Sequence, residues 1–389
     1  MNAELPATTD VLIVGAGPAG LTLATALAGR GVNAVLVDKA PDGANTSRAA
    51  VVHARTLEVL RTIGVSDELV AGGVTVPRFT VRDHDRVLLT VPFDKLPTDF
   101  PYTLLVPQNI TEQVLLNRLR TLGGTVHRPH EITVIEQDPT GVTAKTSGGE
   151  VIRASYVIGT DGMHSTVRER SGISFTGDTY AQSFILADVH LDWTGPADEV
   201  ALYFAPEGVT VVAPLPGGRH RIVATVDEAP EQPGVADVQA LLDARGPHAH
   251  RSTVTGLVWS SRFRVHHRLA DHYRAGRLFL AGDAAHVHSP AGGQGMNTGI
   301  QDALNLAGKL TAVLRDGAPQ TVLDEYEAER RPVAEEVVAF THKMTKVATV
   351  GNSPLRALRN TALRALDWIP AVHRTMAMNL SELATADTH

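Results

Sequence analysis

The sequence predicts an α/β protein into which an antiparallel β-sheet is inserted, followed by a helical C-terminal region. Three observations support this prediction. A strand, a glycine-rich turn and a helix open the chain from Asp10. Residues from about Phe175 to Arg268 change to strands that alternate apolar and polar side chains, as in a sheet with one buried face. After Gly299 the pattern is mostly helical.

The composition is that of a globular protein, with a length that suits about two to three domains. Of its 389 residues, 43% are hydrophobic and 20% are charged, which excludes a disordered or fibrous chain. The chain has no cysteine, so disulfides, thiolate metal sites, a cysteine nucleophile and a cysteine-linked cofactor are excluded. The net charge of −7 provides no general attraction for nucleic acid or an anionic membrane, and neither partner is expected.

The apolar run from Val11 to Ala28 does not have the features of a targeting segment or a membrane span. No Lys or Arg precedes it, and several glycines and a proline interrupt it. No later stretch reaches the roughly 20 apolar residues that a span needs. The cytoplasm is therefore the expected compartment.

The N-terminal segment has the pattern of a Rossmann-like βαβ unit. A buried strand over 10–14 leads into the turn Gly15-Ala16-Gly17-Pro18-Ala19-Gly20, and a helix continues to Arg30. A second buried strand, 33–37, ends at Asp38. A parallel crossover of about 30 residues fits this length.

This unit predicts a dinucleotide site. Gly15 permits the tight turn, Gly17 lets a pyrophosphate approach the backbone, and Gly20 lets helix and strand pack closely. The helix N-terminus offers free N–H groups to phosphates, and Asp38 would accept hydrogen bonds from ribose hydroxyls. The alternative is a plain βαβ turn with incidental glycines. The fingerprint by itself does not separate NAD from FAD.

The remaining elements follow from periodicity and turn residues. A capping box is expected at Asn109 and Glu112, opening a helix that runs through Leu122. Other helices are expected at 56–63, 320–349 and, as a basic amphipathic piece, 355–376. Strands are expected within 74–91 and at 132–136, 142–146, 151–154, 156–159, 184–191, 200–204, 209–214, 221–226 and 277–281.

Two later strand ends carry an acidic residue beside glycine. The first is Asp161-Gly162, in a segment that closes with Arg168. The second is Gly282-Asp283, which leads through a glycine-rich loop into a helix from about Gly299. Such a loop is a further anion-binding helix N-terminus.

Together these motifs resemble the class A flavin-dependent aromatic hydroxylases, which have the p-hydroxybenzoate hydroxylase fold. The similarity extends from Asp10 to about Pro332 and is closest at 282–310 and 324–332, particularly to the branch that acts on phenols and polyketides. The resemblance implies a GR2-type FAD-binding domain formed by residues 1–174 and 269–389. Residues 175–268 would form the substrate-binding sheet domain.

The resemblance also implies which residues bind the cofactors, namely non-covalent FAD and, transiently, NADPH or NADH. The ADP half of FAD would lie on Gly15, Gly17, Pro18, Ala19, Gly20, Asp38 and Lys39. Arg48 and Gln108 match positions along the pyrophosphate and the flavin. Asp161, Gly162 and Arg168 match a segment that contacts FAD and NADPH. Gly282 and Asp283 match the ribityl and pyrophosphate contacts, and Pro290, Gly293, Gly295, Met296 and Asn297 match the loop whose amides face flavin N1 and O2.

Each of these residues also has a plainer interpretation. Asp161 and Asp283 could be helix caps, Arg48 a surface arginine, and Gln108 a residue at a helix start. The histidines at 266, 267, 286 and 288 superficially look like metal ligands, but no carboxylate at suitable spacing completes a site. No metal is therefore expected.

The reaction implied is hydroxylation of an aromatic or polyketide-type substrate by O₂, through a flavin C4a-hydroperoxide formed after reduction by NAD(P)H. No catalytic side chain is identified, although Tyr203, His220 and Arg221 are polar candidates in the sheet. The alternatives are another flavin oxidoreductase of this fold, such as a dehydrogenase, reductase or halogenase, or a non-catalytic flavin-binding accessory protein. The expected partner is a small aromatic or polycyclic molecule, and the chain is expected to be a monomer or a homodimer.

Overall fold

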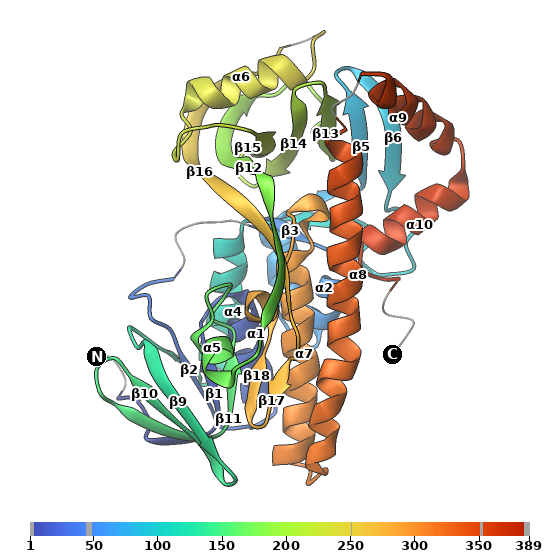
Figure 1. The fold of residues 1–389 in the computed structure, drawn as a ribbon. Coiled ribbons are helices and arrows are strands. Elements are labelled where there is room, and N and C mark those ends of the chain that lie inside the picture. The colour runs from blue at the N-terminus through green and yellow to red at the C-terminus, as the bar shows by residue number, and fades with distance from the viewer. Residues whose placement is uncertain (1–3, 44–48, 250, 351–352, 385–389) are drawn as a thin grey trace.

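The computed structural model describes residues 4–43, 49–249, 251–350 and 353–384. Figure 1 shows two lobes, one built on a parallel sheet near the N-terminus and one on a second sheet at the opposite end. Helix α8 (Asp324–Ala348) runs beside both lobes. The α/β fold with an inserted sheet and C-terminal helices is therefore confirmed.

The first lobe is built on a sheet of order β17-β18-β11-β1-β2-β8, with β10 and β9 extending from β11. β1 pairs in parallel with β2 and β11, and β11 pairs in parallel with β18. The strands are β1 Thr8–Val14, β2 Ala34–Val37, β8 Val126–His127, β9 Ile132–Asp138, β10 Gly141–Thr146, β11 Val151–Gly159, β17 Arg274–Ala275 and β18 Leu278–Leu280. The C-terminal parts of β1, β2 and β11 and all of β18 are buried, as in a sheet covered on both faces.

Strand β11 corrects the expectation of two separate strands at 151–154 and 156–159. It is continuous over Val151–Gly159. Its first half pairs antiparallel with β10, and its second half lies parallel to β18. β11 can pair with both β10 and β18 because it is long enough to extend from the edge of the β9–β10 hairpin into the buried centre of the sheet.

Helices enclose this sheet. α1 (Pro18–Gly29) is buried from Gly20 to Leu27 and packs against α4 (Gln108–Thr121) and α7 (Gly295–Leu314). An apolar helix without a polar side is typical of a helix that is covered all round. α5 (Thr166–Ser171) follows β11. α2 (Ala54–Arg61), α3 (Ser66–Gly72) and a small sheet of β3 (Val51–Val52), β7 (Thr103–Leu105) and β4 (Val74–Val76) complete the lobe.

The second lobe is a sheet of order β19-β16-β12-β15-β14-β13-β5-β6. Its strands are β5 Arg78–Asp83, β6 Arg86–Pro92, β12 Phe175–Asp192, β13 Glu199–Ala205, β14 Gly208–Leu215, β15 Arg219–Val226, β16 Thr253–Ala270 and β19 His286–Val287. Most neighbours are antiparallel, but β13 and β5 are parallel. The hairpin β5–β6, from the N-terminal part of the chain, therefore belongs to this sheet, a pairing that local sequence does not indicate.

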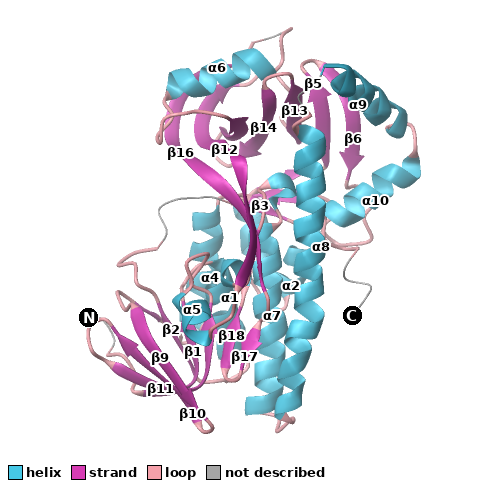
Figure 2. Cartoon of the chain, viewed as in Figure 1, coloured by secondary structure: helices cyan, strands magenta, loops and turns pink. Residues whose placement is uncertain are grey.

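Two 18-residue strands, β12 and β16, connect the lobes. They pair antiparallel over almost their whole length and cross from one lobe to the other as a twisted ribbon (Figure 2). Helix α6 (Val235–Arg245), which the sequence analysis does not predict, covers one face of the sheet. The other face packs on the core of the first lobe through Val200, Ala213 and Leu215.

The C-terminal part is helical as expected. The 3₁₀ turns η1 (Gly282–Ala284), η2 (Ala291–Gly293) and η3 (Gln320–Leu323) flank α7 and lead into α8. The predicted basic amphipathic piece forms two helices, α9 (Ser353–Leu366) and α10 (Pro370–Leu380). Over the described residues, every helix is too short or too polar to cross a bilayer.

Candidate cofactor site

The turn between β1 and α1 separates its three glycines into two roles. Gly15 has φ of +103°, and a Cβ there would lie 2.5 Å from the carbonyl oxygen of Thr160. A Cβ at Gly20 would lie 1.9 Å from the carbonyl oxygen of Gly15. A Cβ at Gly17 would meet no atom within 4 Å. Gly15 and Gly20 are therefore required for packing, whereas Gly17 leaves open space in front of the backbone.

The N-termini of α1 and α7 meet beside this space. Gly17 precedes α1 with extended backbone, and Pro18 is its first residue, a position where the missing N–H costs nothing. A Cβ at Gly299 would lie 3.7 Å from the Ala19 Cβ and 3.0 Å from the Gly282 Cα. Small residues thus bring two helix starts together. Their first N–H groups have no intrahelical acceptor, so they can bind anions.

Asp38 at the end of β2 is directed at the glycine turn. Its Oδ2 accepts a hydrogen bond of 2.6 Å from the backbone N–H of Ala16, and its Oδ1 accepts one of 2.7 Å from Ala40. The half-buried carboxylate holds the turn in shape and keeps further lone pairs for a ligand. Lys39 beside it is exposed.

Gln108 connects two segments near the start of α4. Its Oε1 accepts from the N–H of Ala49 at 3.2 Å, and its Nε2 donates to Glu112 at 2.8 Å. The expected capping box is wrong, because α4 begins one residue earlier, at Gln108 itself, and Asn109 is exposed within the helix. Arg48, next to Ala49, lies outside the described residues.

Asp161 bonds to the first turn of helix α5, whose N-cap residue is Ser165. Its carboxylate accepts from the Ser165 hydroxyl at 2.5 Å and from the backbone N–H groups of Thr166 at 2.7 Å and Val167 at 3.3 Å. Burial raises the pKa of Asp161, although these hydrogen bonds act in the opposite direction. Gly162 follows with φ of +79°. The structure therefore assigns Asp161 a local structural role, and its cofactor contact stays a prediction.

Arg168 joins this segment to the Gly282–Ala284 turn. Its guanidinium donates to the carbonyl oxygens of Ala284 at 2.8 Å and Met163 at 2.7 Å, and it lies 3.9 Å over the ring of Phe175. Arg168 is buried. It therefore holds the two predicted cofactor segments at a constant separation. Asp283, in contrast, is exposed between buried neighbours in η1.

The glycine-rich loop before α7 is held by Asn297. This fully buried side chain accepts from the N–H of His53 at 2.9 Å and donates to the carbonyl oxygens of Val51 at 2.9 Å and Gly293 at 2.7 Å. Gly293 has φ of +67°, and a Cβ there would lie 2.7 Å from the Val51 side chain. The loop residues Pro290, Gly295 and Met296 are half-buried. The Asn297 side chain thus shapes the loop.

A buried charge network lies directly behind this loop. Asp302 on α7 bonds to His286 Nε2 at 2.6 Å and accepts from Arg330 Nε at 2.8 Å and from the Gly282 N–H at 3.3 Å. All three side chains are buried. Burial by itself raises the pKa of Asp302, but Arg330 and His286 outweigh it and lower the pKa below its usual value. In the sequence His286 stands out only as part of the glycine-rich loop, and no local pattern indicates its partners.

The histidines are engaged in protein contacts. His53 Nε2 bonds to the Gly292 carbonyl at 2.7 Å, and His288 Nδ1 bonds to the Ser289 carbonyl at 2.8 Å. Burial lowers the pKa of both His53 and His288 to about 4, so they are neutral near pH 7. Within the described ranges, no three or more histidine, aspartate or glutamate side chains are grouped so that they could hold a metal ion.

The polar candidates in the second sheet point in different directions. Tyr203 packs with Val238 and Leu242 of α6, on the face turned away from the first lobe. Arg221 lies on the opposite face, buried, with Asp188 accepting from its Nε at 2.7 Å and its Nη2 at 2.8 Å. His220 is half-buried and tilted against Trp193 at 5.8 Å between ring centroids. Of the three, Arg221 therefore belongs to the face that overlies the first lobe.

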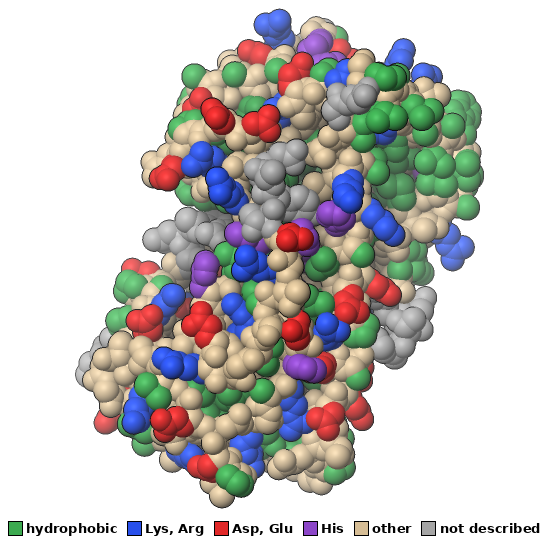
Figure 3. Space-filling view, viewed as in Figure 1, with side chains coloured by type: hydrophobic (Ala, Val, Ile, Leu, Met, Phe, Trp, Pro, Cys, Tyr) green, Lys and Arg blue, Asp and Glu red, His purple; other side chains and the backbone are tan. Residues whose placement is uncertain are grey.

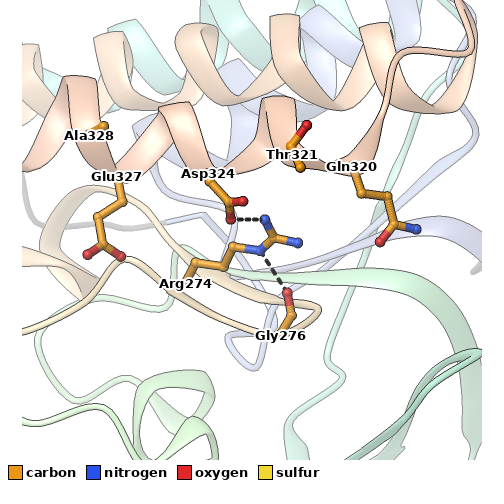
Figure 4. A pocket seen from close by; sticks show the side chains of 7 residues that line it. All are labelled: Arg274, Gly276, Gln320, Thr321, Asp324, Glu327 and Ala328. Carbon is orange, nitrogen blue, oxygen red and sulfur yellow. Dashed lines mark hydrogen bonds and ion pairs between the residues drawn. The ribbon is translucent and has the colours of Figure 1, made fainter.

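Two pockets lie at different distances from the predicted cofactor residues. The larger, about 670 Å³, lies where β17 meets η3 and the start of α8, and Arg274 there donates to Asp324 at 2.5 Å (Figure 4). The smaller, about 200 Å³, lies between α7, α8 and the C-terminal residues, behind the glycine-rich loop. Its lining comprises Gln294, Thr298, Gln301, Val333, Glu336, Val337, Phe340, Asn379, Glu382 and Ala384. Only the smaller pocket adjoins the predicted cofactor residues.

Comparison with known proteins identifies the family to which this chain belongs. Residues 8–341 match the family model described as "FAD binding domain". The chain is 40% identical over 352 residues to a 6-methylpretetramide 4-monooxygenase of Streptomyces rimosus, covering 88% of this chain and 63% of that protein. It is 36% identical to a rifampicin monooxygenase of Streptomyces venezuelae, covering 89% and 73%. The structure resembles p-nitrophenol 4-monooxygenase PnpA of Pseudomonas putida DLL-E4, with a TM-score of 0.87, 29% identity and coverage of 97% and 99%.

Proposed function

This chain belongs to the FAD binding domain family, and on that premise we propose that it is an FAD-dependent, NAD(P)H-consuming monooxygenase that hydroxylates an aromatic or polyketide-type substrate. One observation carries the proposal: the open space at Gly17, where the N-termini of α1 and α7 converge. Two helix N-termini disfavour a cationic ligand and bind an anionic pyrophosphate more strongly than a neutral group. The names of the relatives, which include rifampicin and p-nitrophenol, support the substrate class.

The residues of the first lobe fit FAD. The amides at the start of α1 would bind the pyrophosphate across Gly17, and the free lone pairs of Asp38 would accept from the adenosine ribose. Exposed Asp283 would lie along the ribityl chain. The amides from Gly295 to Asn297, at the positive end of α7, would oppose negative charge at flavin N1 and O2. Bound FAD would supply hydride acceptance and O₂ activation, which no protein side chain provides.

We assign Asp161 and Arg168 to positioning. Asp161 fixes the start of α5, and Arg168 ties Met163 to Ala284. The two hold the segment that the family resemblance associates with FAD and NAD(P)H, so a transient nicotinamide site would lie close to it. Loss of either would alter the spacing between this segment and the Gly282–Ala284 turn.

The substrate would lie between the second sheet and the first lobe. Arg221 and Asp188 occupy that face of the sheet and balance each other's charge while buried. Such a surface suits a largely apolar aromatic molecule that also needs a polar contact. Enclosure between two lobes excludes water, which protects reactive oxygen chemistry from wasteful hydrolysis.

The test is NADPH consumption by the purified, FAD-loaded chain in air, with and without a panel of phenols and polycyclic aromatic compounds. We expect slow basal oxidation, strong stimulation by a suitable substrate, and incorporation of one oxygen atom from isotopically labelled O₂ into the product. Stimulation without labelled product would favour a reductase or dehydrogenase. A chain that binds FAD and never oxidises NADPH or NADH would favour the non-catalytic accessory protein.

A further inference from the structure

Helix α9 exposes several of its apolar residues to the solvent, although Leu363 packs against the core. Leu355 is 54% exposed and Leu358 is 67% exposed, and Leu366 continues the same side at helical spacing. Trp368, 88% exposed, and Ile369 follow in the turn toward α10. We call these five residues the α9 patch. Figure 3 shows apolar side chains gathered at the edge of the second lobe where Figure 1 places α9 and α10. A large exposed apolar surface of this kind marks an interaction site.

Polar contacts fix this orientation of α9. Arg359, one turn after Leu355 at the edge of the side that packs on the chain, is buried and donates to the carbonyl oxygens of Val347 at 3.2 Å and Ala348 at 3.0 Å. Its guanidinium also lies 4.9 Å over the ring of Phe204. Rotating α9 to bury Leu355 and Leu358 would break these contacts and leave the carbonyl oxygens of Val347 and Ala348 without the Arg359 hydrogen bonds. The outward apolar side is therefore a built feature of the fold.

The C-terminal segment that carries the patch is net positive, unlike the whole chain. Residues 353–380 contain four arginines and one aspartate, whereas the whole chain has a net charge of −7. Arg364 and Arg374 are exposed beside the apolar residues. The single acid, Asp367, accepts from the Thr90 N–H at 2.8 Å and bonds to His373 at 3.2 Å. An apolar stripe flanked by arginines is complementary to a surface that is apolar beneath and anionic above.

We propose that the α9 patch rests on the surface of an anionic lipid bilayer. Leu355, Leu358 and Leu366 would enter the boundary between headgroups and acyl chains, and Trp368 would lie at headgroup level. Arg364 and Arg374 would contact anionic headgroups. The helix lies in the plane of the membrane in this arrangement and does not cross it. This proposal does not depend on the proposed reaction.

Charge disfavours a second copy of the chain as the occupant. A two-fold dimer through α9 would bring each patch against itself. Arg364 and Arg374 would then approach arginines of the partner, and Asp367 is already bonded within its own chain. Like charges brought together without water are unfavourable. An anionic bilayer has no such conflict.

The test is sedimentation of the full, FAD-loaded chain with two kinds of vesicle, pure phosphatidylcholine and an equal mixture of phosphatidylcholine and phosphatidylglycerol. We expect binding to the anionic vesicles that weakens with added salt. Leu358→Glu and Trp368→Glu should each weaken that binding about tenfold or more. The control is Val151→Glu, at a valine 48% exposed on β11 in the other lobe, which should bind as the unmodified chain does. FAD content should be unchanged in all three variants.

Two results would overturn the proposal. One is equal or absent binding to both vesicle types, or equal binding by Leu358→Glu and Val151→Glu. The other is a dimer in analytical ultracentrifugation that Leu358→Glu dissociates and the control does not, which would make the patch an interface between copies. Neither measurement uses substrate or NADPH, so failure here leaves the monooxygenase assay unaffected.

Discussion

Two alanine substitutions in one turn should act on different properties, Gly20→Ala on folding and Gly17→Ala on cofactor binding. In Gly20→Ala the new Cβ would lie 1.9 Å from the carbonyl oxygen of Gly15, far inside van der Waals contact, so β1 and α1 must separate by more than an ångström. Overpacking of this kind in a buried region costs about 2 to 3 kcal/mol. In Gly17→Ala the new Cβ meets nothing within 4 Å, and φ is already −78°. We expect its free energy of unfolding to stay within about 1 kcal/mol of the unmodified chain.

The same Gly17→Ala change should impair FAD binding, because its methyl group would occupy the space across which the pyrophosphate reaches the α1 amides. An increase in Kd of about tenfold or more is expected, equivalent to about 1.4 kcal/mol. Gly20→Ala should lose stability first, and its FAD binding should suffer as a consequence of misfolding.

The assay measures both quantities on the same protein preparations. Urea unfolding of the flavin-free chain reports stability, and titration of flavin fluorescence reports the Kd for FAD. The reasoning is refuted if Gly17→Ala binds FAD as tightly as the unmodified chain. It is equally refuted if the two variants lose the same unfolding free energy, because the geometry distinguishes them.

Three further predictions concern buried polar groups. Asp302→Asn leaves Arg330 buried without its countercharge and should lower the free energy of unfolding in urea by about 3 to 5 kcal/mol. The control Asp99→Asn, which breaks an exposed ion pair, should lower it by less than about 1 kcal/mol. Similar losses in the two variants would contradict this prediction. Burial raises the pKa of Glu382 to about 8, so the folded chain should lose stability as pH rises from about 5 to about 8. Glu382→Gln should flatten that slope, and an unchanged slope would show that another group causes it. Asn297→Asp places a carboxylate against two carbonyl oxygens and should lower thermal stability and FAD content together; a variant with normal flavin content would argue against its role in shaping the loop.

Local sequence was sufficient for the elements that depend on neighbouring residues. The spacing of Gly15, Gly17 and Gly20 after a buried strand predicts the turn, because chain direction and glycine conformation act over a few residues. Alternation and helical periodicity predicted most strands and helices for the same reason. The helix start at Gln108 was displaced by one residue, since capping depends on backbone conformation that composition does not specify.

Long-range contacts decided the remainder. The pairing of β5 with β13 joins residues more than a hundred positions apart, and nothing in either strand encodes its partner. The Asp302 network depends on α7, α8 and the Gly282 turn meeting at one place. The bonds that Asp161 and Arg168 make within the protein depend on the packing of α5 and the Gly282 turn, which no local pattern specifies.

The sequence by itself determined the family, the glycine-rich turn after β1 and most of the strands and helices, since these rest on motifs and periodicities read along the chain. The tertiary structure decided which glycine leaves room for a ligand and which way Arg221 points. It also decided that Leu355, Leu358 and Leu366 of α9 stay exposed while Leu363 packs against the core, in an orientation in which Arg359 bonds to the carbonyl oxygens that end α8. An amphipathic pattern specifies that a helix has an apolar side, and only the packed chain specifies what that side faces.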